Sequence, residues 1–449
     1  MSSGDGEAKT TDSTLLRFSA PGKTILFGEH AVVYGKTAIA GSIGLRTTAE
    51  VRIRLPSGSV LDEQIELNLP DLNFCRSFSR RKLFDAAAKL ERICREDGDF
   101  DWQLPPLPDI AVPLARELIG PIEITSTPTK HAATPVNLAM LTFIYVLLCA
   151  MTRNRILLNN MNTLKRQEIP AFKLTISSKV PIRVGLGSSA AYCVSLCAAV
   201  LRLANLIDEP SMDLIDGKTW TEDSLCAIER WAKAAESLIH GKTSGLDVVV
   251  CARGGLISYQ QGQQPIPISC KADLRVIIVN TRVERNTLHM IGIVKQKLEK
   301  YPEVLTKIFD SMDEIAKEAA RLLSQLPPVQ SNGDADLSDE KEYEGLQVGV
   351  FIHLLIYADI QELCRINNHL LNGIGVGHAK SAQICALLAR YGIHTKLSGA
   401  GGGGTCFAFI TKAASQTLLQ MIESELCSLG FELWQPNLGG NGVVQEETR

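Results

Sequence analysis

The sequence has no large excess of charge of either sign, and this absence limits the partners that it can have. Its 46 lysines and arginines nearly balance 49 aspartates and glutamates, which leaves a formal net charge of −3 over 449 residues. A chain without a basic surface does not favour nucleic acid, so no nucleic-acid partner is expected. The hydrophobic content of 45% is that of an ordinary globular protein, with length for two or three domains.

Cysteine patterns typical of metal sites are missing as well. The 12 cysteines form no CxxC pair and show no zinc-type spacing. Several of them lie in apolar runs with helical spacing, where cysteine acts as a small hydrophobic residue. We therefore predict free thiols and a reducing compartment.

The chain also lacks a secretory signal and a hydrophobic run long enough for a membrane. Residues 1–14 are polar and acidic, which predicts a disordered tail. The longest apolar run, from Leu138 to Met151, falls short of the roughly 20 residues that span a bilayer, so a buried core helix is expected there. The final Glu-Glu-Thr-Arg is not a peroxisomal signal. A cytoplasmic protein without membrane association is the expectation.

What the sequence does contain is a mixture of strand and helix patterns without strict alternation, which predicts an α+β fold. Strands are expected within 15–55 and at 172–178, 274–280, 405–411 and 431–434. Helices are expected at 80–95, 191–205, 223–239, 304–326, from about 347, from about 379 and at 412–429. The stripe predicted to face the core of the 304–326 helix comprises Val304, Ile308, Met312, Ile315, Ala319, Leu322 and Leu326.

Two segments predict irregular structure. Prolines at 104–113 indicate an irregular surface segment, and residues 329–345 are acidic and nearly free of large apolar groups, which predicts a mobile acidic loop. A domain boundary is placed near residue 265.

A glycine–serine turn lies between the predicted strand 172–178 and the helix that follows it. It reads Gly185-Leu186-Gly187-Ser188-Ser189-Ala190. Backbone N–H groups at a helix start lack partners inside the helix, and the helix dipole favours an anion there. The glycines let a phosphate approach the backbone, and the serines add hydroxyls for phosphate or metal. An ordinary loop is the alternative for such a cluster taken alone.

Two further motifs carry polar groups among glycines. Near the N-terminus, Ala20-Pro-Gly-Lys23 is followed by Gly28-Glu-His30, where Lys23 is either a solvated surface charge or a fixed positive charge for a substrate. Near the C-terminus, the run Ser398 to Thr405 contains the glycine-rich stretch 399–404. That run is either a flexible linker or a tight turn against a substrate, and its position directly before a predicted strand favours the turn.

Two carboxylates flank another turn. Glu236 lies late in the predicted helix 223–239, and Asp247 follows a Ser-Gly turn. Surface charges are the simplest interpretation of the two. If they face one site, one carboxylate can hold Mg²⁺ while the other orients a hydroxyl or accepts its proton.

In this order the motifs resemble those of the GHMP small-molecule kinases, over residues 15 to about 435. The segments Ala20–Lys36, Ile239–Asp247, Asn280–Thr287 and Gly375–Ala379 are similar to the branch that phosphorylates mevalonate. The resemblance implies a ribosomal-protein-S5-domain-2-like N-terminal domain at 15–265 and a ferredoxin-like α/β C-terminal domain at 266–449. The active site would lie in the cleft between the two domains.

The activity implied by the resemblance is transfer of the γ-phosphoryl group of ATP, with Mg²⁺, to the C5 hydroxyl of mevalonate. The products would be 5-phosphomevalonate and ADP, on the route to isoprenoids and sterols. A homodimer and feedback inhibition by prenyl diphosphates at the ATP site are further expectations from the family.

The resemblance also assigns residues to roles. Catalytic roles fall to Asp247 and Lys23, with Asp247 acting as a base or as an orienting group. Mg²⁺ would be held by Ser189 and Glu236. The mevalonate pocket would contain Glu29, His30, Arg285 and Thr287. ATP and its phosphates would contact Lys23, Ser178, Gly185, Leu186, Gly187, Ser188, Ser189, Gly401 and Gly402.

The sequence departs from the family pattern at several positions. Arg183 replaces a glycine before the turn, where it either contacts nucleotide phosphates or points to solvent, and solvent is favoured. Asp71 stands where relatives have an asparagine that contacts the nucleotide, which puts that contact in doubt. Residues 97–110 and 329–345 are interpreted as insertions.

Two other functions are weighed against this one. A kinase of the same superfamily with another alcohol as acceptor is the first, and Glu29-His30 argues for mevalonate. A nucleotide sensor without catalysis is the second, and the presence of Lys23, Glu236 and Asp247 argues against it. A dinucleotide-binding dehydrogenase is excluded because the turn lacks the third glycine of that fingerprint.

Overall fold

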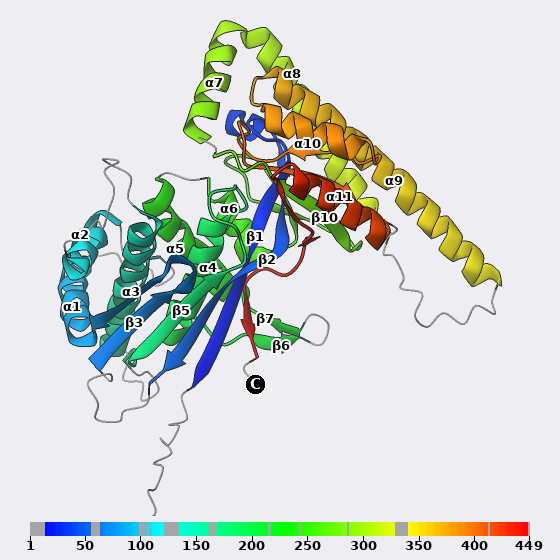
Figure 1. The fold of residues 1–449 in the computed structure, drawn as a ribbon. Helices are drawn as coiled ribbons and strands as arrows, with labels where there is room; N and C mark the ends of the chain where they lie inside the picture. Colours follow the sequence, from blue (N-terminus) through cyan, green and yellow to red (C-terminus); the bar gives the residue numbers. More distant parts are fainter. Residues whose placement is uncertain are drawn as a thin grey trace, which may run out of the picture.

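Thirteen of the strands that the structure describes form one sheet, which joins the beginning of the chain to its end in this computed structural model (Figure 1). The structure describes residues 14–54, 63–97, 104–105, 108–120, 134–160, 168–213, 217–241, 244–284, 287–327, 340–411 and 414–447. The longest pair in the sheet is β1 (Leu15–Phe27) with β2 (Ala38–Ile53), which run antiparallel.

The remaining strands extend this pair on both sides. They are β3 (Gln64–Leu69), β4 (Phe74–Ser79), β5 (Phe172–Ser178), β8 (Leu256–Tyr259), β9 (Ile266–Ile268), β10 (Leu274–Asn280), β11 (Lys396–Leu397), β12 (Thr405–Ile410), β13 (Glu432–Trp434), β14 (Asn437–Leu438) and β15 (Val444–Glu446). The main path through the sheet is β11-β12-β10-β14-β2-β5-β3-β4, and β3 with β5 is a parallel pair. A separate hairpin consists of β6 (Ser211–Asp213) and β7 (Gly217–Thr219).

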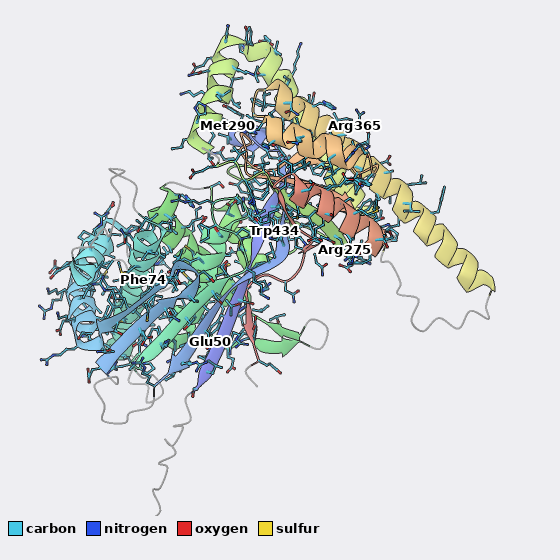
Figure 2. All side chains as sticks on the ribbon, viewed as in Figure 1. Glu50, Phe74, Arg275, Met290, Arg365 and Trp434 are labelled. Carbon is cyan, nitrogen blue, oxygen red and sulfur yellow. The ribbon has the colours of Figure 1, made fainter. Side chains whose placement is uncertain are left out.

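The helices form two groups in space (Figure 1). The first comprises α1 (Arg80–Asp97), α2 (Pro108–Ile119), α3 (Pro135–Asn160), α4 (Ser188–Leu203), α5 (Glu222–His240) and α6 (Leu246–Arg253). The second comprises α7 (Thr287–Lys300), α8 (Pro302–Gln325), α9 (Glu340–Gly373), α10 (Ala379–Ala389) and α11 (Gln416–Ser428). Two 3-10 turns, η1 (Ala31–Tyr34) and η3 (Pro70–Leu72), complete the described elements. Figure 2 shows Met290 and Arg365 on helices of the second group, and Phe74 on β4 beside the first group.

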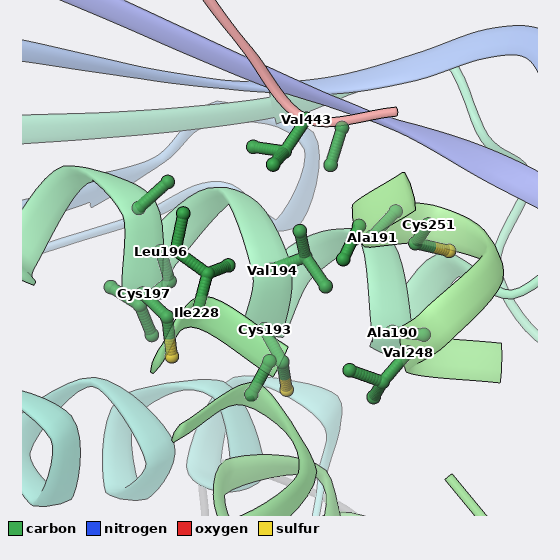
Figure 3. Close-up of a cluster of buried hydrophobic side chains, with 14 of the residues drawn as sticks. Ala190, Ala191, Cys193, Val194, Leu196, Cys197, Ile228, Val248, Cys251 and Val443 are labelled. Atoms are coloured by element: carbon green, nitrogen blue, oxygen red, sulfur yellow. The ribbon is translucent and has the colours of Figure 1, made fainter. Parts of the chain in front are cut away.

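The helix that follows the glycine–serine turn is the centre of the first core. Nearly every side chain of α4 from Ala190 to Leu203 is buried. Its residues pack against Ile228 of α5, Val248 and Cys251 of α6, and Val443 near the C-terminus (Figure 3). Packing of this kind fixes a helix in position, because a dense core tolerates little displacement. The N-terminus of α4 is therefore held rigidly against β1.

Most predicted elements are confirmed. The strands at 172–178 and 274–280 have the predicted bounds, and the helices at 80–95, 223–239 and 379 onward lie within two residues of their predicted starts. The α+β class is confirmed as well. The boundary near residue 265 stays a prediction.

Two predictions about irregular segments are wrong in part. Pro108–Ile119 forms α2 despite Pro113, because Ala111, Ala115 and Ile119 recur every four residues and bury one face of a helix. Residues 340–345 of the predicted acidic loop begin α9, while 328–339 lie outside the described residues. The predicted tail is also outside them up to residue 13.

The buried stripe of α8 differs from the predicted one. Leu305, Phe309 and Ala316 are buried, whereas Val304 at the start of the predicted stripe is 57% exposed. Met312, Ile315, Ala319 and Leu322 are common to both. In its first residues α8 therefore buries a face next to the predicted one, because Phe309 stacks on Tyr34 of η1.

The apolar helix at Leu138 to Met151 is buried as predicted but longer. α3 has 26 residues, and its segment Pro135–Leu158 is long and apolar enough to cross a membrane by length and composition. In the most apolar window of that segment, 67% is buried inside the protein. A helix at the centre of a protein core meets the same criterion.

Candidate active site

The N-terminal motif and the glycine–serine turn lie directly against each other. The backbone N–H of Lys23 donates to the carbonyl oxygen of Leu186 at 2.8 Å. A Cβ on Gly22 would lie 2.7 Å from that same oxygen. Gly187 has φ +74°, and a Cβ there would lie 2.8 Å from Cγ of Lys23. Both glycines are therefore required by the close approach of β1 to the turn.

The glycine–serine turn and the first residues of α4 line a cavity of about 350 Å³. Gly187 is the N-cap residue of the helix, and it has no side chain that could accept from the first N–H groups of α4. Polar groups of Ser178, Ser188, Ser189, His240 and Asp247 line the cavity together with Asp71 and Arg183. Its apolar lining comes from Leu69, Leu72, Pro135, Leu138, Ala139, Ile176, Ile182, Tyr192 and Ile239. Such a site accepts a ligand with an apolar ring and an anionic end.

Lys23 and Asp247 form an ion pair at this site. Nζ of Lys23 lies 2.9 Å from Oδ1 of Asp247, which is in the first turn of α6. The lysine side chain is only 6% exposed, whereas the carboxylate is 36% exposed. The ammonium is thus held by the fold, and the carboxylate on the open side can reach a ligand.

Glu236 and Ser189 come from neighbouring helices. Glu236 is buried on α5, the helix that ends at His240. Burial raises the pKa of the Cys251 thiol, and the charges of Asp247 and Glu236 raise it further, while Lys23 opposes them. The charges of both predicted carboxylates and of Lys23 therefore act on one buried thiol, which indicates that the two carboxylates lie in the same region.

The hydroxyl of Ser189 has a protein partner. Its Oγ lies 2.9 Å from Nε2 of His240, a residue that the sequence interpretation did not include. No group of three or more His, Cys, Asp and Glu side chains within the described ranges could hold a metal ion. A cation here would need oxygens from a ligand in addition to those of Ser189 and Glu236.

The C-terminal glycine run reaches the same place from the second group of helices. Oγ of Ser398 donates to the carbonyl of Ile25 at 3.0 Å, and Oγ1 of Thr405 donates to the carbonyl of Val184 at 3.5 Å. A Cβ on Gly401 would lie 2.2 Å from the carbonyl oxygen of Val376. The run is a packed turn, as its position before a strand predicted, and not a flexible linker.

His30 contacts this run. It has φ +60° and is buried, and its Nε2 lies 2.9 Å from the carbonyl oxygen of Ala400. Because a carbonyl only accepts, Nε2 carries the proton and Nδ1 is the acceptor of the neutral ring. Burial lowers the pKa of His30, although the bond to Ala400 and the charge of Glu29 act in the opposite direction. The ring is therefore neutral near pH 7.

Glu29 is fully buried and forms an ion pair with Lys396 of β11, whose side chain is also 0% exposed. Nδ2 of Asn367 on α9 donates to its other oxygen at 3.2 Å. The sequence interpretation missed both partners. The only signal in the sequence was a lysine three residues before the glycine run.

Of the remaining predicted residues, Ser178 lines the cavity and Thr287 does not. Thr287 is the exposed first residue of α7, and Arg285 lies outside the described residues. Ser178 ends β5, and its backbone N–H donates to Oδ2 of Asp71 at 2.6 Å. The Arg183 side chain is 61% exposed, its Nη1 lies 3.7 Å from Oε1 of Glu284, and the residue also lines the cavity.

Comparisons with known proteins agree with the motifs. The family model "GHMP kinases N terminal domain" matches residues 153–255, and "GHMP kinases C terminal" matches 353–428. The chain is 31% identical to mevalonate kinase of Mus musculus over 433 residues, covering 96% of this chain and 95% of that protein. It is 32% identical to mevalonate kinase of Homo sapiens, with the same shares covered. Mevalonate kinase of Arabidopsis thaliana is 31% identical, covering 94% of this chain and 97% of that protein.

Solved structures share the fold. Mevalonate kinase of Methanococcus jannaschii has a TM-score of 0.58 at 21% identity, covering 96% of this chain and 100% of that one. Mevalonate kinase of L. major in complex with R-mevalonate has a TM-score of 0.55 at 20% identity, covering 98% and 100%.

Proposed function

Because the chain belongs to the mevalonate kinase family of the GHMP kinases, we infer that it is a kinase that phosphorylates mevalonate with ATP in isoprenoid synthesis. We propose in detail that it transfers the γ-phosphoryl group to the C5 hydroxyl and releases 5-phosphomevalonate and ADP. The observation that carries this proposal is the contact between three motifs. The glycine–serine turn is bonded to Lys23, which pairs with Asp247, and the C-terminal glycine run is bonded to Ile25 and Val184 beside them.

ATP binds in the cavity beside α4. The apolar lining accepts the adenine ring, and the N–H groups of the first turn of α4 face the phosphates, where the helix dipole favours negative charge. Gly185, Leu186, Gly187, Ser188 and Ser189 provide the backbone of this phosphate site. Gly401 and Gly402 close it from the C-terminal half.

Two of the predicted residues carry oxygen donors of the kind that Mg²⁺ prefers. Ser189 and Glu236 offer a hydroxyl and a carboxylate, and Mg²⁺ in kinases is held by one or two protein oxygens together with substrate phosphates. We propose that these two residues hold the ion. When bound with ATP, Mg²⁺ neutralises charge on the β- and γ-phosphate oxygens.

Lys23 and Asp247 act on the reacting atoms. Asp247 orients the C5 hydroxyl toward the γ-phosphorus and accepts its proton as the new O–P bond forms and the bond to the ADP oxygen breaks. Lys23, held at 2.9 Å from Asp247, neutralises charge on the transferred group. Phosphoryl transfer depends on positioning and charge neutralisation, which is what this buried ammonium and exposed carboxylate can supply.

The acceptor lies on the side of the N-terminal motif. His30 offers a neutral ring with Nδ1 as acceptor, and we keep Glu29, Arg285 and Thr287 as proposed members of the mevalonate pocket. A homodimer, inhibition by prenyl diphosphates at the ATP site and a cytoplasmic location stay predictions from the family resemblance.

The test is ADP release by the purified protein with ATP and Mg²⁺ on mevalonate, phosphomevalonate, galactose and homoserine. Turnover on mevalonate alone supports the proposal. Turnover on another acceptor would keep the phosphate site and reject the assignment of the N-terminal motif to mevalonate. Nucleotide binding without turnover on any acceptor would favour a sensor.

A further inference from the structure

A buried ion pair joins the two halves of the chain behind the active site. The side chains of Glu29 and Lys396 are both 0% exposed, and the two residues are 367 positions apart in the sequence. Nζ of Lys396 also donates to the carbonyl of Leu397 at 3.0 Å. Asn367 donates to the second carboxylate oxygen of Glu29 at 3.2 Å. We call Glu29, Asn367 and Lys396 the buried clamp.

The surroundings of the buried clamp are apolar. Nζ of Lys396 lies 5.7 Å from the ring centre of Phe27 and 4.9 Å from that of Phe407. Charges removed from water in this way lose much of their hydration, and a well-packed apolar pair of similar volume is often as stable or more so. Stability alone therefore does not account for an ion pair at this place. What hydrogen-bonded charges do supply is a defined relative position of two segments.

The segments that the buried clamp fixes are those that form the active site. Glu29 lies between Gly28 and His30, in the turn that leads from β1 into η1. Lys396 begins the strand that leads into the glycine run, and Ala400 of that run accepts from Nε2 of His30 at 2.9 Å. A second bond, from Ser398 to the carbonyl of Ile25, lies between them. The His30 ring is thus held between the buried clamp and the glycine run.

We propose that Lys396 and Asn367 are positioning residues for phosphoryl transfer. Through the carboxylate of Glu29 they fix the place of His30 and of the glycine run 399–404 relative to Lys23. In this arrangement Glu29 does not bind mevalonate directly, because its side chain is 0% exposed and both of its oxygens already have partners in Lys396 and Asn367. The inference rests on the proposed function and refines the role proposed for Glu29 within it.

The location of the buried clamp makes a specific prediction. The lining of the nucleotide cavity contains none of Glu29, Asn367 and Lys396, and it does not contain His30. Loss of the buried clamp should therefore disturb the acceptor side of the site and leave nucleotide binding intact. If the ion pair were purely structural, its loss would lower the melting temperature without affecting mevalonate differently from the nucleotide.

The experiment is a double-mutant cycle on the full-length protein with Glu29→Gln and Lys396→Met. For each variant the KM for mevalonate, kcat, the Kd for ADP and the melting temperature are measured. Lys396→Met should raise the KM for mevalonate or lower kcat by about ten- to a hundredfold, since a shift of about 1 Å in a site has effects of that order. The Kd for ADP should stay at the wild-type value. The double variant should be no worse than Lys396→Met, because both substitutions break the same contact.

Controls separate positioning from stability. Glu91→Gln removes another buried carboxylate that pairs with arginines, far from the motifs on α1, and should lower the melting temperature without changing KM. Asn367→Ser leaves the ion pair in place and removes one bond to Glu29, so it should give a smaller change of the same kind. If Lys396→Met fails to fold, Asn367→Ser takes its place in the double-mutant cycle.

Three outcomes would overturn the proposal. Additive effects of Glu29→Gln and Lys396→Met on KM would mean that Glu29 contacts mevalonate directly. An unchanged KM and kcat with a lower melting temperature would reduce the buried clamp to a structural ion pair. An inactive wild-type protein would reject the proposed function and this inference together, whereas the first two results would reject the inference alone.

Discussion

Single side chains at this site have functions that follow from their burial. Lys23 is buried while its partner Asp247 is on the open side, so the fold holds the ammonium and leaves the carboxylate accessible. The resemblance of the motifs was sufficient to assign these two residues to one site. Lys396 was not predictable, because pairing it with Glu29 requires knowing that segments 367 positions apart meet. A lone lysine in a two-residue strand indicates no partner by itself.

Replacing Asp247 by asparagine should abolish most of the activity. The amide has nearly the same shape but cannot accept the proton of the hydroxyl, and general acid–base groups contribute about 10²- to 10⁴-fold. We expect kcat to fall by that order. The melting temperature should also fall, because the substitution removes the charged partner of the Lys23 ammonium, which is only 6% exposed.

The matched control for Asp247→Asn is Asp310→Asn. Asp310 pairs with Lys36 at 2.5 Å on the exposed surface of α8, so the same chemical change is made at an ion pair outside the cavity. Its kcat should equal that of the wild type. Retention of most of the turnover in Asp247→Asn would remove this residue from the reaction.

The buried ring of His30 should make stability depend on pH. Burial lowers its folded-state pKa below the unfolded value of 6.5, so the unfolded chain binds more protons between the two values. The free energy of unfolding therefore falls as the pH decreases from 6.5 toward the folded-state pKa, and it gains nothing from this group above pH 6.5. Thermal unfolding of the wild type and of His30→Asn at pH 7.5 and 5.5 measures this.

His30→Asn suits the test because asparagine tolerates the positive φ of this position. The decrease in melting temperature between the two pH values should be smaller in this variant than in the wild type. His369→Asn, at an exposed position on α9, is the control and should keep the wild-type difference. If the melting temperature decreases equally between the two pH values in all three proteins, His30 is not the group that titrates.

At the scale of elements, long patterns were predictable and short ones were not. Helices with a continuous apolar period, such as α5, and strands with seven alternating or apolar residues, such as β5 and β10, were found from the sequence. β14 and β15 have two and three residues, too few for any period, and pair only because the fold brings them to β2 and β1. In α2 the four-residue spacing of buried side chains outweighed a proline.

The turn before α4 can be tested through Gly187. Alanine at φ +74° costs about 1–2 kcal/mol in backbone strain. Its Cβ would also lie 2.8 Å from Cγ of Lys23 and displace that side chain. We expect Gly187→Ala to lower kcat by roughly ten- to a hundredfold in addition to the loss of stability.

Gly262→Ala is the control that separates backbone strain from the displacement of Lys23 in Gly187→Ala. Gly262 has φ +82°, and a Cβ there would meet nothing within 4 Å. This variant should lose similar stability in chemical denaturation and keep the wild-type kcat. If both variants are equally active, the contact between the turn and Lys23 does not matter for the reaction.

At the scale of the whole molecule, one sheet connects the N-terminal motif to the C-terminus. β15 pairs with β1 in register from Arg17 opposite Glu446 to Ser19 opposite Val444. Just before β15, Val443 is buried in the core around α4, and its carbonyl accepts from Nε1 of Trp220 at 2.9 Å. The end of the chain therefore supports the strand that carries Lys23. The sequence predicted an α+β fold but not this closure, which depends on contacts between the two ends.

Deleting residues 443–449 should destabilise the protein. The loss of the buried Val443 side chain alone removes about 1.5–3 kcal/mol, and the exposed edge of β1 should promote association. Chemical denaturation and light scattering measure the two effects. Deletion of residues 447–449 alone keeps Val443 and β15 and should behave as the wild type; equal stability of the two deletions would contradict the role given to β15.

The central claim is that the three motifs build one site for phosphoryl transfer to the C5 hydroxyl of mevalonate. Its most direct test is the proton-coupled ³¹P NMR spectrum of the product formed from ATP, Mg²⁺ and mevalonate. A phosphate ester on C5 is coupled to the two protons of that carbon, so we predict a triplet that is absent with Asp247→Asn. A singlet would mean transfer to the tertiary C3 hydroxyl, which carries no proton on its carbon, and the absence of any new phosphate ester would mean no transfer to mevalonate. Either result would contradict the site described here.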